Sequence, residues 1–402
     1  MSDPIVIVSA ARTPIGGLLG DFQSLAAHQL GAIAIRAAVE RAGITGDAVD
    51  EALIGNCLMA GQGQAPARQA VLGAGLPESV GAVTLSKMCG SGMRAMMFAH
   101  DMLRSETADV VIAGGMESMT NAPHLTPMRK GVKYGLAALY DHMALDGLED
   151  AYEKLPGIDG KPGSGKAMGV FAEDCVAKYR FTREQMDQFA ISSTQRAKQA
   201  NEDGSFDWEM APVTLAGRGG ETLIKFDEQP FKAKLDKIAG LKPAFTKDGT
   251  ITAATSSSIS DGAAALVLMR ESTAMKLGRT PLARIRAHAV HAQAPGWFTT
   301  APAGAIDKVL KQCGWAAKDV DLWEVNEAFA VVTLAAMAEF KLPHEIVNVH
   351  GGAVALGHPI GASGARIVVT LLGALRKRGL KRGVAALCIG GGEATALAVE
   401  LI

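Results

Sequence analysis

Residues 90–103, GSGMRAMMFAHDML, recur in altered form at residues 361–375 as GASGARIVVTLLGAL. Both stretches contain Ser-Gly-x-Arg, followed by an apolar run of helical length. Two more pairs keep the same order along the chain: AAVERAGITGDAVD (37–50) with KVLKQCGWAAKDVD (308–321), and VVIAGGMES (110–118) with AALCIGGGEAT (385–395). Matches that keep their order indicate an internal repeat, so the sequence predicts a chain built from two similar halves.

Short apolar runs alternate with longer periodic segments in both halves. The runs PIVIVSA (4–10), DVVIAGG (109–115) and GVAALCIGG (383–391) are typical of buried strands, and the segments between them of helices. This alternation predicts an α/β architecture in which helices cover mixed sheets. Equivalent turns of two similar halves meet at their pseudo-twofold axis, so a site there would draw residues from both halves.

The repeat also predicts the domain boundaries. The expected units are residues 1–120 together with 251–272, residues 121–250, and residues 273–402. The middle unit has no counterpart in the repeat and contains the Gly-, Pro- and Lys-rich stretch PGIDGKPGSGKAMG, so we expect an inserted loop domain there. A helix is expected at 182–203, with Thr182 and Glu184 forming its start signal.

Composition limits the possible functions. The 402 residues are 48% hydrophobic with a net charge of −1, which argues against a broadly basic nucleic-acid-binding surface. The five cysteines form no CxxC pair, so we expect a reducing compartment and neither a disulfide framework nor a zinc site. No apolar run is long enough to cross a membrane. The opening MSDPIVIVSAARTP resembles no leader, so the predicted location is the cytoplasm.

Reactive side chains stand at the predicted turns: Cys89, Asn326, His358 and Cys388. A helix dipole and free N–H groups after Cys89 would favour its thiolate. Pro359 restricts the backbone of His358, and the duplication should place that imidazole near Cys89. A Cys/His pair with a second thiol could accept an acyl group and move protons, while the glycines after Cys388 could hold an oxyanion.

Spacing alone leaves this interpretation open, because a lone cysteine is most often a small core residue. We expect Cys57, Cys175 and Cys313 to be small core residues of this kind. His350 and His358 are eight residues apart, but no matching set of metal ligands accompanies them. No metal is therefore expected.

The combination of motifs resembles the thiolase family along nearly the whole chain. The matching stretches are SAARTPIGG (9–17), SKMCGSG (86–92), GGMESMT (114–120), NEAFA (326–330), GHPIGASGARI (357–367) and CIGGGEA (388–394). The resemblance implies a five-layer α-β-α-β-α fold of two βαβαβαββ halves, with a loop domain that carries coenzyme A. It also implies a homo-oligomer, either a tetramer or a dimer, with acyl-CoA substrates and no prosthetic group.

The same resemblance implies a role for each reactive group. Cys89 would be the nucleophile that takes the acyl group, and His358 would deprotonate it and contribute to an oxyanion hole. Asn326 would hold a water in that hole. Cys388 would be the acid/base for the carbon–carbon step. The backbone N–H groups of Cys89 and Gly390 would form a second oxyanion hole around the acyl-enzyme.

Coenzyme A contacts are also implied by the resemblance. The residues expected along the pantetheine tunnel are Met168, Phe245, Ser257, Ala328 and Phe329. Arg218 and Lys166 are candidates for the phosphates, on charge and loop position alone. Trp297 and Phe298 stand near the expected acyl pocket, where bulky rings would favour a short chain such as acetyl.

The implied reaction is the Claisen condensation of two acetyl-CoA molecules to acetoacetyl-CoA and coenzyme A, with thiolysis as its reverse. A degradative 3-ketoacyl-CoA thiolase of broader chain length is the first alternative. A ketoacyl synthase acting on acyl carrier protein would lack the second catalytic cysteine, so Cys388 argues against it. A thiolase-like protein that binds coenzyme A or lipid without catalysis is an alternative of another class.

Overall fold

The computed structural model describes residues 3–126, 128–131, 134–154, 165–217 and 219–402. Its main strands in the first half are β1 (Ile5–Arg12), β2 (Gly16–Gly17), β3 (Glu51–Gly55), β4 (Gly81–Leu85), β5 (Val110–Ser118) and β12 (Ser260–Arg270). Those in the second half are β13 (Ala283–Ala292), β14 (Leu322–Val325), β15 (Arg382–Ile389) and β16 (Glu393–Leu401). Within the described ranges they follow one order, β14-β15-β16-β13-β1-β12-β5-β3-β4, with β2 beside β12.

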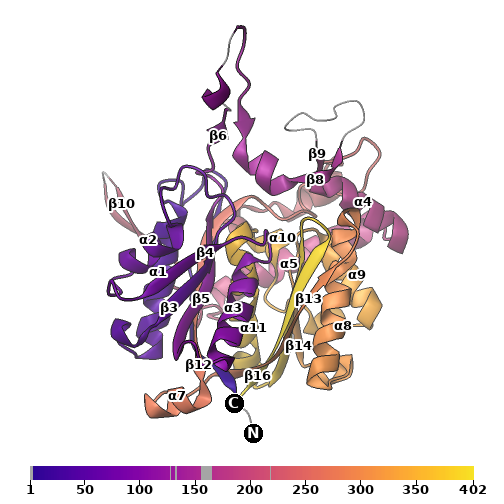
Figure 1. Ribbon diagram of the computed structural model, residues 1–402. Coiled ribbons are helices and arrows are strands. Elements are labelled where there is room, and N and C mark those ends of the chain that lie inside the picture. The colour runs from indigo at the N-terminus through magenta and orange to yellow at the C-terminus, as the bar shows by residue number, and fades with distance from the viewer. Residues whose placement is uncertain (1–2, 127, 132–133, 155–164, 218) are drawn as a thin grey trace.

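The strands lie in two facing groups with helices between and outside them (Figure 1). The central layer holds α3 (Ser91–Arg104) and α11 (Ile360–Arg378), and the outer layers hold α1 (Ala27–Ala42), α2 (Pro66–Gly73), α8 (Ala301–Cys313) and α9 (Ala330–Phe340). The two groups join through β1 and β13, which pair at Val6 with Arg284 and Ile7 with Ala283. The layers therefore run α-β-α-β-α, as the resemblance to the thiolase family implies.

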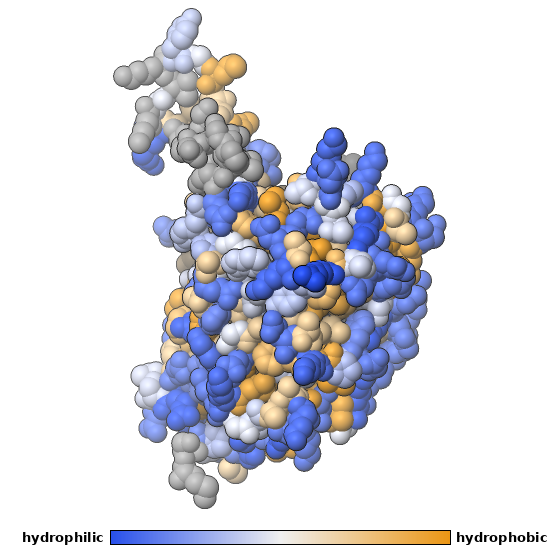
Figure 2. Space-filling view, turned by 90° about the vertical axis from the view of Figure 1, so that its right-hand side faces the viewer, coloured by the Kyte–Doolittle hydropathy of each residue, from blue (hydrophilic) through white to orange (hydrophobic). Residues whose placement is uncertain are grey.

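The central helix α11 is buried from Ile360 to Leu375 because it contacts both groups of strands. Residues on every side of this span are buried, which is typical of a helix without a solvent face. The outer helix α8 is instead amphipathic: Ile306 and Val309 are buried, and Lys308 and Lys311 point outward. Figure 2 shows that the face over α8 and α9 mixes hydrophilic and hydrophobic residues.

The two halves differ at one edge. The first half runs β1-α1-β3-α2-β4-α3-β5-β12, and the second runs β13-α8-β14-α9-α11-β15-β16. The place of β4 is taken in the second half by an isolated bridge between Trp323 and Val347. Asn348 has a φ of 47°, and its side chain bonds the N–H and C=O of Val325 at 2.9 and 2.8 Å. The side chain of Asn348 therefore makes the backbone hydrogen bonds at the end of β14 that a neighbouring strand would otherwise make.

Residues 121–250 cover one end of both groups of strands. Their elements are β6 (His124–Leu125), β7 (Tyr140–Asp141), β8 (Glu149–Lys154), β9 (Gly165–Ala167), α4 (Met168–Tyr179), α5 (Arg183–Glu202), β10 (Val213–Gly217), β11 (Gly220–Ile224) and α6 (Gln229–Lys232). The stretch around β6 projects from the body (Figure 1), while α4 and α5 contact α9, and α5 also contacts α10 (Ala353–Leu356). The remaining helix, α7 (Glu271–Lys276), follows β12. No helix in these ranges combines the length and apolarity needed to cross a membrane.

The start of α5 differs in detail from the sequence prediction. Thr182 is the N-cap, and its side chain accepts a hydrogen bond from the backbone N–H of Gln185. The side-chain oxygen of Gln185 in turn accepts a hydrogen bond from the backbone N–H of Thr182 at 2.8 Å. Gln185 therefore closes the capping box, where the sequence suggested Glu184, because the partner must stand three residues after the cap.

Candidate active site

A cavity of about 320 Å³ lies among the turns that end the strands of both halves. Ten of the residues predicted from the sequence line it: Cys89, Met168, Phe245, Ser257, Phe298, Ala328, Phe329, His358, Cys388 and Gly390. Further apolar side chains complete its walls: Met88, Met119, Leu148 and Ile360. The cavity therefore presents a few reactive groups on an apolar surface, as is typical of small-molecule sites.

Cys89 lies in the tight turn between β4 and α3. Met88 before it has a φ of 46°, a left-handed conformation that is strained for a residue with a side chain. The Ser91 hydroxyl accepts from the N–H of Lys87 at 2.8 Å and donates to the carbonyl of Met88 at 2.7 Å. These bonds hold the turn and present Cys89 to the cavity. The sequence carried no signal for the strained Met88, because that conformation usually falls on glycine.

The thiol of Cys89 is protonated at neutral pH. Burial raises its pKa to about 11, although the backbone N–H groups of Gly390 and of Cys89 itself oppose that shift. The expectation of a stabilised thiolate is therefore wrong for the free protein, because the cost of burying a charge exceeds the help of the helix terminus. The two N–H groups also converge near the sulfur, so negative charge that develops there would be stabilised.

His358 is buried and held by a serine five residues later. Its Nδ1 lies 2.6 Å from the Ser363 hydroxyl, which donates its own proton to the carbonyl of Pro359 at 2.9 Å. We therefore assign the imidazole proton to Nδ1, which leaves Nε2 as an acceptor. Nε2 is buried and has no hydrogen-bonding partner among the described residues. Burial, with Arg366 nearby, lowers the pKa of His358 to about 3, so the ring is neutral.

Cys388 is the penultimate residue of the buried strand β15, and 1% of its surface is exposed. Burial and, second, the neighbouring Cys89 raise its pKa well above the usual value, so the two sulfurs are close enough to interact. The turn of Cys89 packs directly on this strand end, because a Cβ on Gly90 would collide with Ile389. The duplication therefore brings one reactive turn from each half together.

Glu117, at the end of β5, holds both halves around the site and was not singled out from the sequence. Its carboxylate is fully buried and accepts from the N–H groups of Cys57 and Gly361 at 2.9 and 2.8 Å. It also accepts from the Asn56 side chain at 2.7 Å and the N–H of Leu58 at 3.1 Å. Gly361 starts α11 just after His358. The GGMES motif contained the residue, but only the fold reveals these partners.

The predicted tunnel residues form an aromatic wall. The ring centroids of Phe329 lie 5.8 Å from Phe245 and 6.4 Å from Phe298, both close to edge-on. Gly169 packs on Phe245 so closely that a Cβ there would collide with the ring. The N–H of Ser257 donates to the carbonyl of Ala328 at 3.0 Å, which joins the two loops beside that wall.

Three predicted residues do not line the cavity, and a fourth lies outside the described residues. Asn326 is buried behind the cavity, with its Oδ1 3.4 Å from Arg366 and its Nδ2 unpaired within the described ranges. Lys166 forms an ion pair of 2.9 Å with Glu153. Trp297 is partly exposed beneath Lys178, so of the two expected rings Phe298 alone lines the cavity. Arg218 lies outside the described residues.

Two duplicated α/β halves that bring two thiols, one of them fully buried, and a neutral imidazole into one apolar cavity define an enzyme of the acyl-transferring cysteine class. The chain belongs to the thiolase family. The thiolase N-terminal domain matches residues 5–272, and the thiolase C-terminal domain matches residues 279–401. Thiolases act on coenzyme A thioesters and carry no prosthetic group.

Relatives and solved structures agree over the full length. The probable acetyl-CoA acetyltransferase of Dictyostelium discoideum is 49% identical over 99% of this chain and 94% of its own. The acetyl-CoA acetyltransferase of Cupriavidus necator is 45% identical over 98% and 99%. The Bacillus anthracis acetyl-CoA acetyltransferase superposes with a TM-score of 0.94 at 39% identity, covering 100% of this chain and 99% of its own. Acat5 thiolase from Ascaris suum, solved with coenzyme A, gives 0.92 at 40% identity, covering 99% and 100%. The predicted thiolase-like fold is confirmed.

Proposed function

We propose that this thiolase is an acetyl-CoA C-acetyltransferase, which condenses two acetyl-CoA molecules to acetoacetyl-CoA and coenzyme A and catalyses the reverse thiolysis. The observation that carries the proposal is the meeting of Cys89, His358 and Cys388 in one apolar cavity. The names of the relatives, which are 45–49% identical in the two cases above, support the acetyl group as the substrate.

In the first step, Cys89 passes its proton to Nε2 of His358 as its sulfur attacks the thioester carbonyl of acetyl-CoA. The tetrahedral oxyanion collapses, the carbon–sulfur bond to coenzyme A breaks, and His358 returns the proton to the departing thiolate. The products are acetyl-Cys89 and free coenzyme A. A neutral thiol and a neutral imidazole suit this step, because each changes charge only while the bond is forming.

In the second step, the proton of the Cys388 thiol moves to His358, and the resulting thiolate removes a proton from the methyl group of a second acetyl-CoA. The carbanion attacks acetyl-Cys89, the bond between the acetyl carbon and the Cys89 sulfur breaks as acetoacetyl-CoA forms, and the departing Cys89 thiolate takes the proton from His358. A raised pKa makes the Cys388 thiolate a stronger base, which suits a weakly acidic C–H bond. His358 and a water held by Asn326 stabilise the enolate oxygen, and the N–H groups of Cys89 and Gly390 stabilise the other oxyanion.

The walls of the cavity support a short acyl group. Phe298, Met119 and Leu148 line the space around the reactive groups, while Met168, Phe245 and Phe329 suit the pantetheine arm. We therefore expect acetyl to be preferred over long chains. A broad degradative thiolase would instead need room beyond these side chains.

The division of the chain is part of the same proposal. We assign the nucleophile to residues 1–120 with 251–272, coenzyme A binding and subunit contacts to 121–250, and the remaining catalytic groups to 273–402. We further propose a cytoplasmic homo-oligomer, either tetramer or dimer. Light scattering coupled to size-exclusion chromatography tests the assembly, and a monomer would contradict it.

The test of the function is peptide mass spectrometry after mixing the protein with acetyl-, butyryl- or octanoyl-CoA. We expect an acetyl adduct on the Cys89 peptide that weakens with chain length and is absent in Cys89→Ala. Cys313→Ala, which changes a thiol outside the cavity, is the matched control. Equal labelling by octanoyl-CoA would indicate a broad degradative enzyme. Coenzyme A binding without any adduct would indicate a binding protein.

A further inference from the structure

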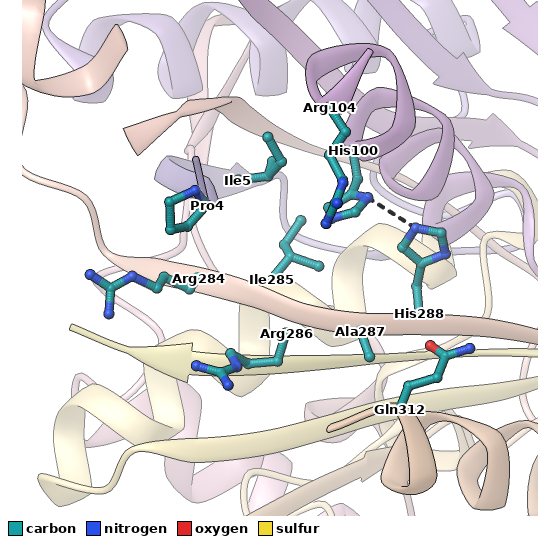
Figure 3. Close-up of a pocket in the computed structure, with 10 residues that line it drawn as sticks. All are labelled: Pro4, Ile5, His100, Arg104, Arg284, Ile285, Arg286, Ala287, His288 and Gln312. Carbon is teal, nitrogen blue, oxygen red and sulfur yellow. Dashed lines mark hydrogen bonds between the residues drawn. The ribbon is translucent and has the colours of Figure 1, made fainter. Parts of the chain in front are cut away.

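A cluster of nitrogen and oxygen donors joins the two halves on a face separate from the catalytic cavity. His100 and Asp101 belong to α3, and His288 belongs to β13. The two imidazoles turn toward one another in Figure 3. Their ring centroids are 4.7 Å apart with the planes at 83°, and Nδ1 of His100 and Nε2 of His288 approach to 3.1 Å.

Three donor atoms of this cluster form an equilateral triangle. His100 Nδ1 lies 3.1 Å from His288 Nε2, and each nitrogen lies 3.1 Å from Oδ1 of Asp101. An ion roughly 2.0–2.1 Å from all three atoms would sit about 1 Å above their plane, with angles of about 100° between ligands. These values fit one face of a tetrahedral or octahedral site.

We propose that His100, Asp101 and His288 bind a divalent transition-metal ion of the zinc class. Two imidazoles and one carboxylate are a donor set that suits Zn²⁺ and its neighbours more than Ca²⁺ or Mg²⁺. The site is separate from the proposed acyl-transfer chemistry and supplies no group to it.

A neighbouring cavity of about 460 Å³ leaves room for the remaining ligands. His100 and His288 line it together with Arg104 and Gln312 (Figure 3). Water or a small anion can therefore complete the coordination, and the protein supplies one face of the site.

The surrounding charges favour an anion as one of those further ligands. Arg284 pairs with Glu271 at 2.6 Å and Arg286 with Glu400 at 2.9 Å, so both positive charges are largely compensated. Arg104 lines the same cavity and forms no ion pair within the described ranges. A chloride or carboxylate bound to the metal would be attracted by Arg104 and would offset the repulsion between the guanidinium and the ion.

A shared proton is the competing explanation for the cluster. One hydrogen on His100 Nδ1 could bond both His288 Nε2 and Asp101 Oδ1, but such a divided bond is weak and leaves the third side of the triangle without a hydrogen. A cation satisfies all three lone pairs at once. The two explanations differ in one measurable respect, because a shared proton needs no metal.

Cobalt titration of the metal-free full-length protein tests the proposal, because Co²⁺ reports its ligands by absorption. We expect one Co²⁺ per chain, visible d–d bands, no thiolate-to-cobalt charge-transfer band, and displacement by Zn²⁺. Zn²⁺ should also raise the melting temperature, since an ion that binds the folded state stabilises it. The missing charge-transfer band separates this site from Cys89 and Cys388.

Three variants locate the ion. His288→Gln and His100→Gln should weaken Co²⁺ binding by at least about tenfold. Asp101→Asn should weaken it as well, and because Asp101 is half-exposed, this variant is expected to fold even if a histidine variant does not. His291→Gln on the same strand, where the ring bonds Gln293 at 3.1 Å, is the matched control and should bind like wild type. Thiolysis by His288→Gln should equal that of wild type.

Three outcomes would each overturn the proposal: no Co²⁺ bound by the wild-type protein at millimolar concentration, unchanged binding in His288→Gln and Asp101→Asn, or a thiolate charge-transfer band. Loss of Co²⁺ binding in these variants, with acyl transfer unchanged, would support a metal site that takes no part in the acyl-transfer reaction. Failure of the acyl-adduct experiment would leave this site unaffected, so the two proposals fail independently.

Discussion

Cys388 and Cys89 occupy one cavity but are assigned different steps, which a single substitution can separate. We expect Cys388→Ala to form the acetyl adduct on Cys89 normally and to lose condensation by about 10²–10⁴-fold, the usual worth of a positioned acid/base. Adduct formation by mass spectrometry and acetoacetyl-CoA formation by absorbance measure the two steps. Cys313→Ala is the control. Wild-type turnover in Cys388→Ala would show that a second thiol is not needed.

Ser363 holds the imidazole of His358, to which we assign the proton transfer, but does not itself line the cavity. Its hydroxyl lies 2.6 Å from Nδ1 of His358 and fixes which nitrogen carries the proton. Ser363→Ala should therefore slow Cys89 acylation by roughly tenfold, a part of what general-base catalysis supplies, with little change in KM. Stopped-flow measurement of coenzyme A release checks this. Ser105→Ala, which removes an exposed hydroxyl at the end of α3, should act like wild type.

The raised pKa of Cys89 sets the pH dependence of its alkylation. The reactive form is the thiolate, and a pKa of about 11 means that the thiol predominates at lower pH. The rate of iodoacetamide labelling at Cys89 should therefore rise about tenfold per pH unit from about pH 7 to about pH 10. A plateau near neutral pH would instead indicate a thiolate–imidazolium pair. Peptide mass spectrometry assigns the labelled cysteine.

Sequence motifs located the reactive side chains but not their ionisation. Cys89, His358 and Cys388 could be found because each stands in a local motif whose residue types suggest its chemistry. The pKa values of Cys89 and His358 depend on burial by residues distant in the chain, which no motif encodes. The role of Glu117 could not be predicted for the same reason, because its hydrogen-bond partners Cys57 and Gly361 are distant in the chain.

At the scale of elements, α3 and α11 cross so closely that glycines face each other. A Cβ on Gly364 would lie 2.5 Å from the backbone nitrogen of Met93, and one on Gly92 would lie 2.8 Å from that of Ala365. Gly364→Ala should cost roughly 1–3 kcal/mol by overpacking and slow acylation, because α11 begins beside His358. Gly240→Ala, where the methyl group meets open space, is the control. Urea unfolding and adduct kinetics measure both effects.

Elements were predicted well where the pattern is local. The helix expected at 182–203 is α5, at Arg183–Glu202, because its cap and periodicity lie within the segment. The shortened edge of the second half was not foreseen. It depends on the side chain of Asn348 reaching Val325, a contact between segments that periodicity cannot register.

At the scale of the whole molecule, a buried charge cluster attaches residues 121–250 to the sheet. Arg12 on β1 is fully buried and pairs with Glu209 and, at 2.7 Å, with Asp227. Arg12→Ala would leave two buried carboxylates without their partner and should cost roughly 3–5 kcal/mol. Chemical denaturation measures the loss. Lys311→Ala, which breaks an exposed pair with Asp307, should leave stability unchanged; equal stability of the Arg12 and Lys311 variants would contradict this.

The duplication was the sequence feature that predicted the architecture of the whole molecule. The stretches at 90–103 and 361–375 became α3 and α11, the two helices of the central layer. The repeat predicts that these two helices face each other. It does not predict where the elements that pack against them end. The join between the groups of strands at β1 and β13 likewise depends on pairing across the whole chain.

The crossing of α3 and α11 also limits which substitutions the protein can tolerate at the contact between the two helices. Gly92 and Gly364 are far apart in the sequence, yet a larger residue at either position would meet the backbone of the other helix. Each copy of the repeated stretch therefore limits which residues the other copy can carry at this contact, whatever the outer surfaces of the two halves carry.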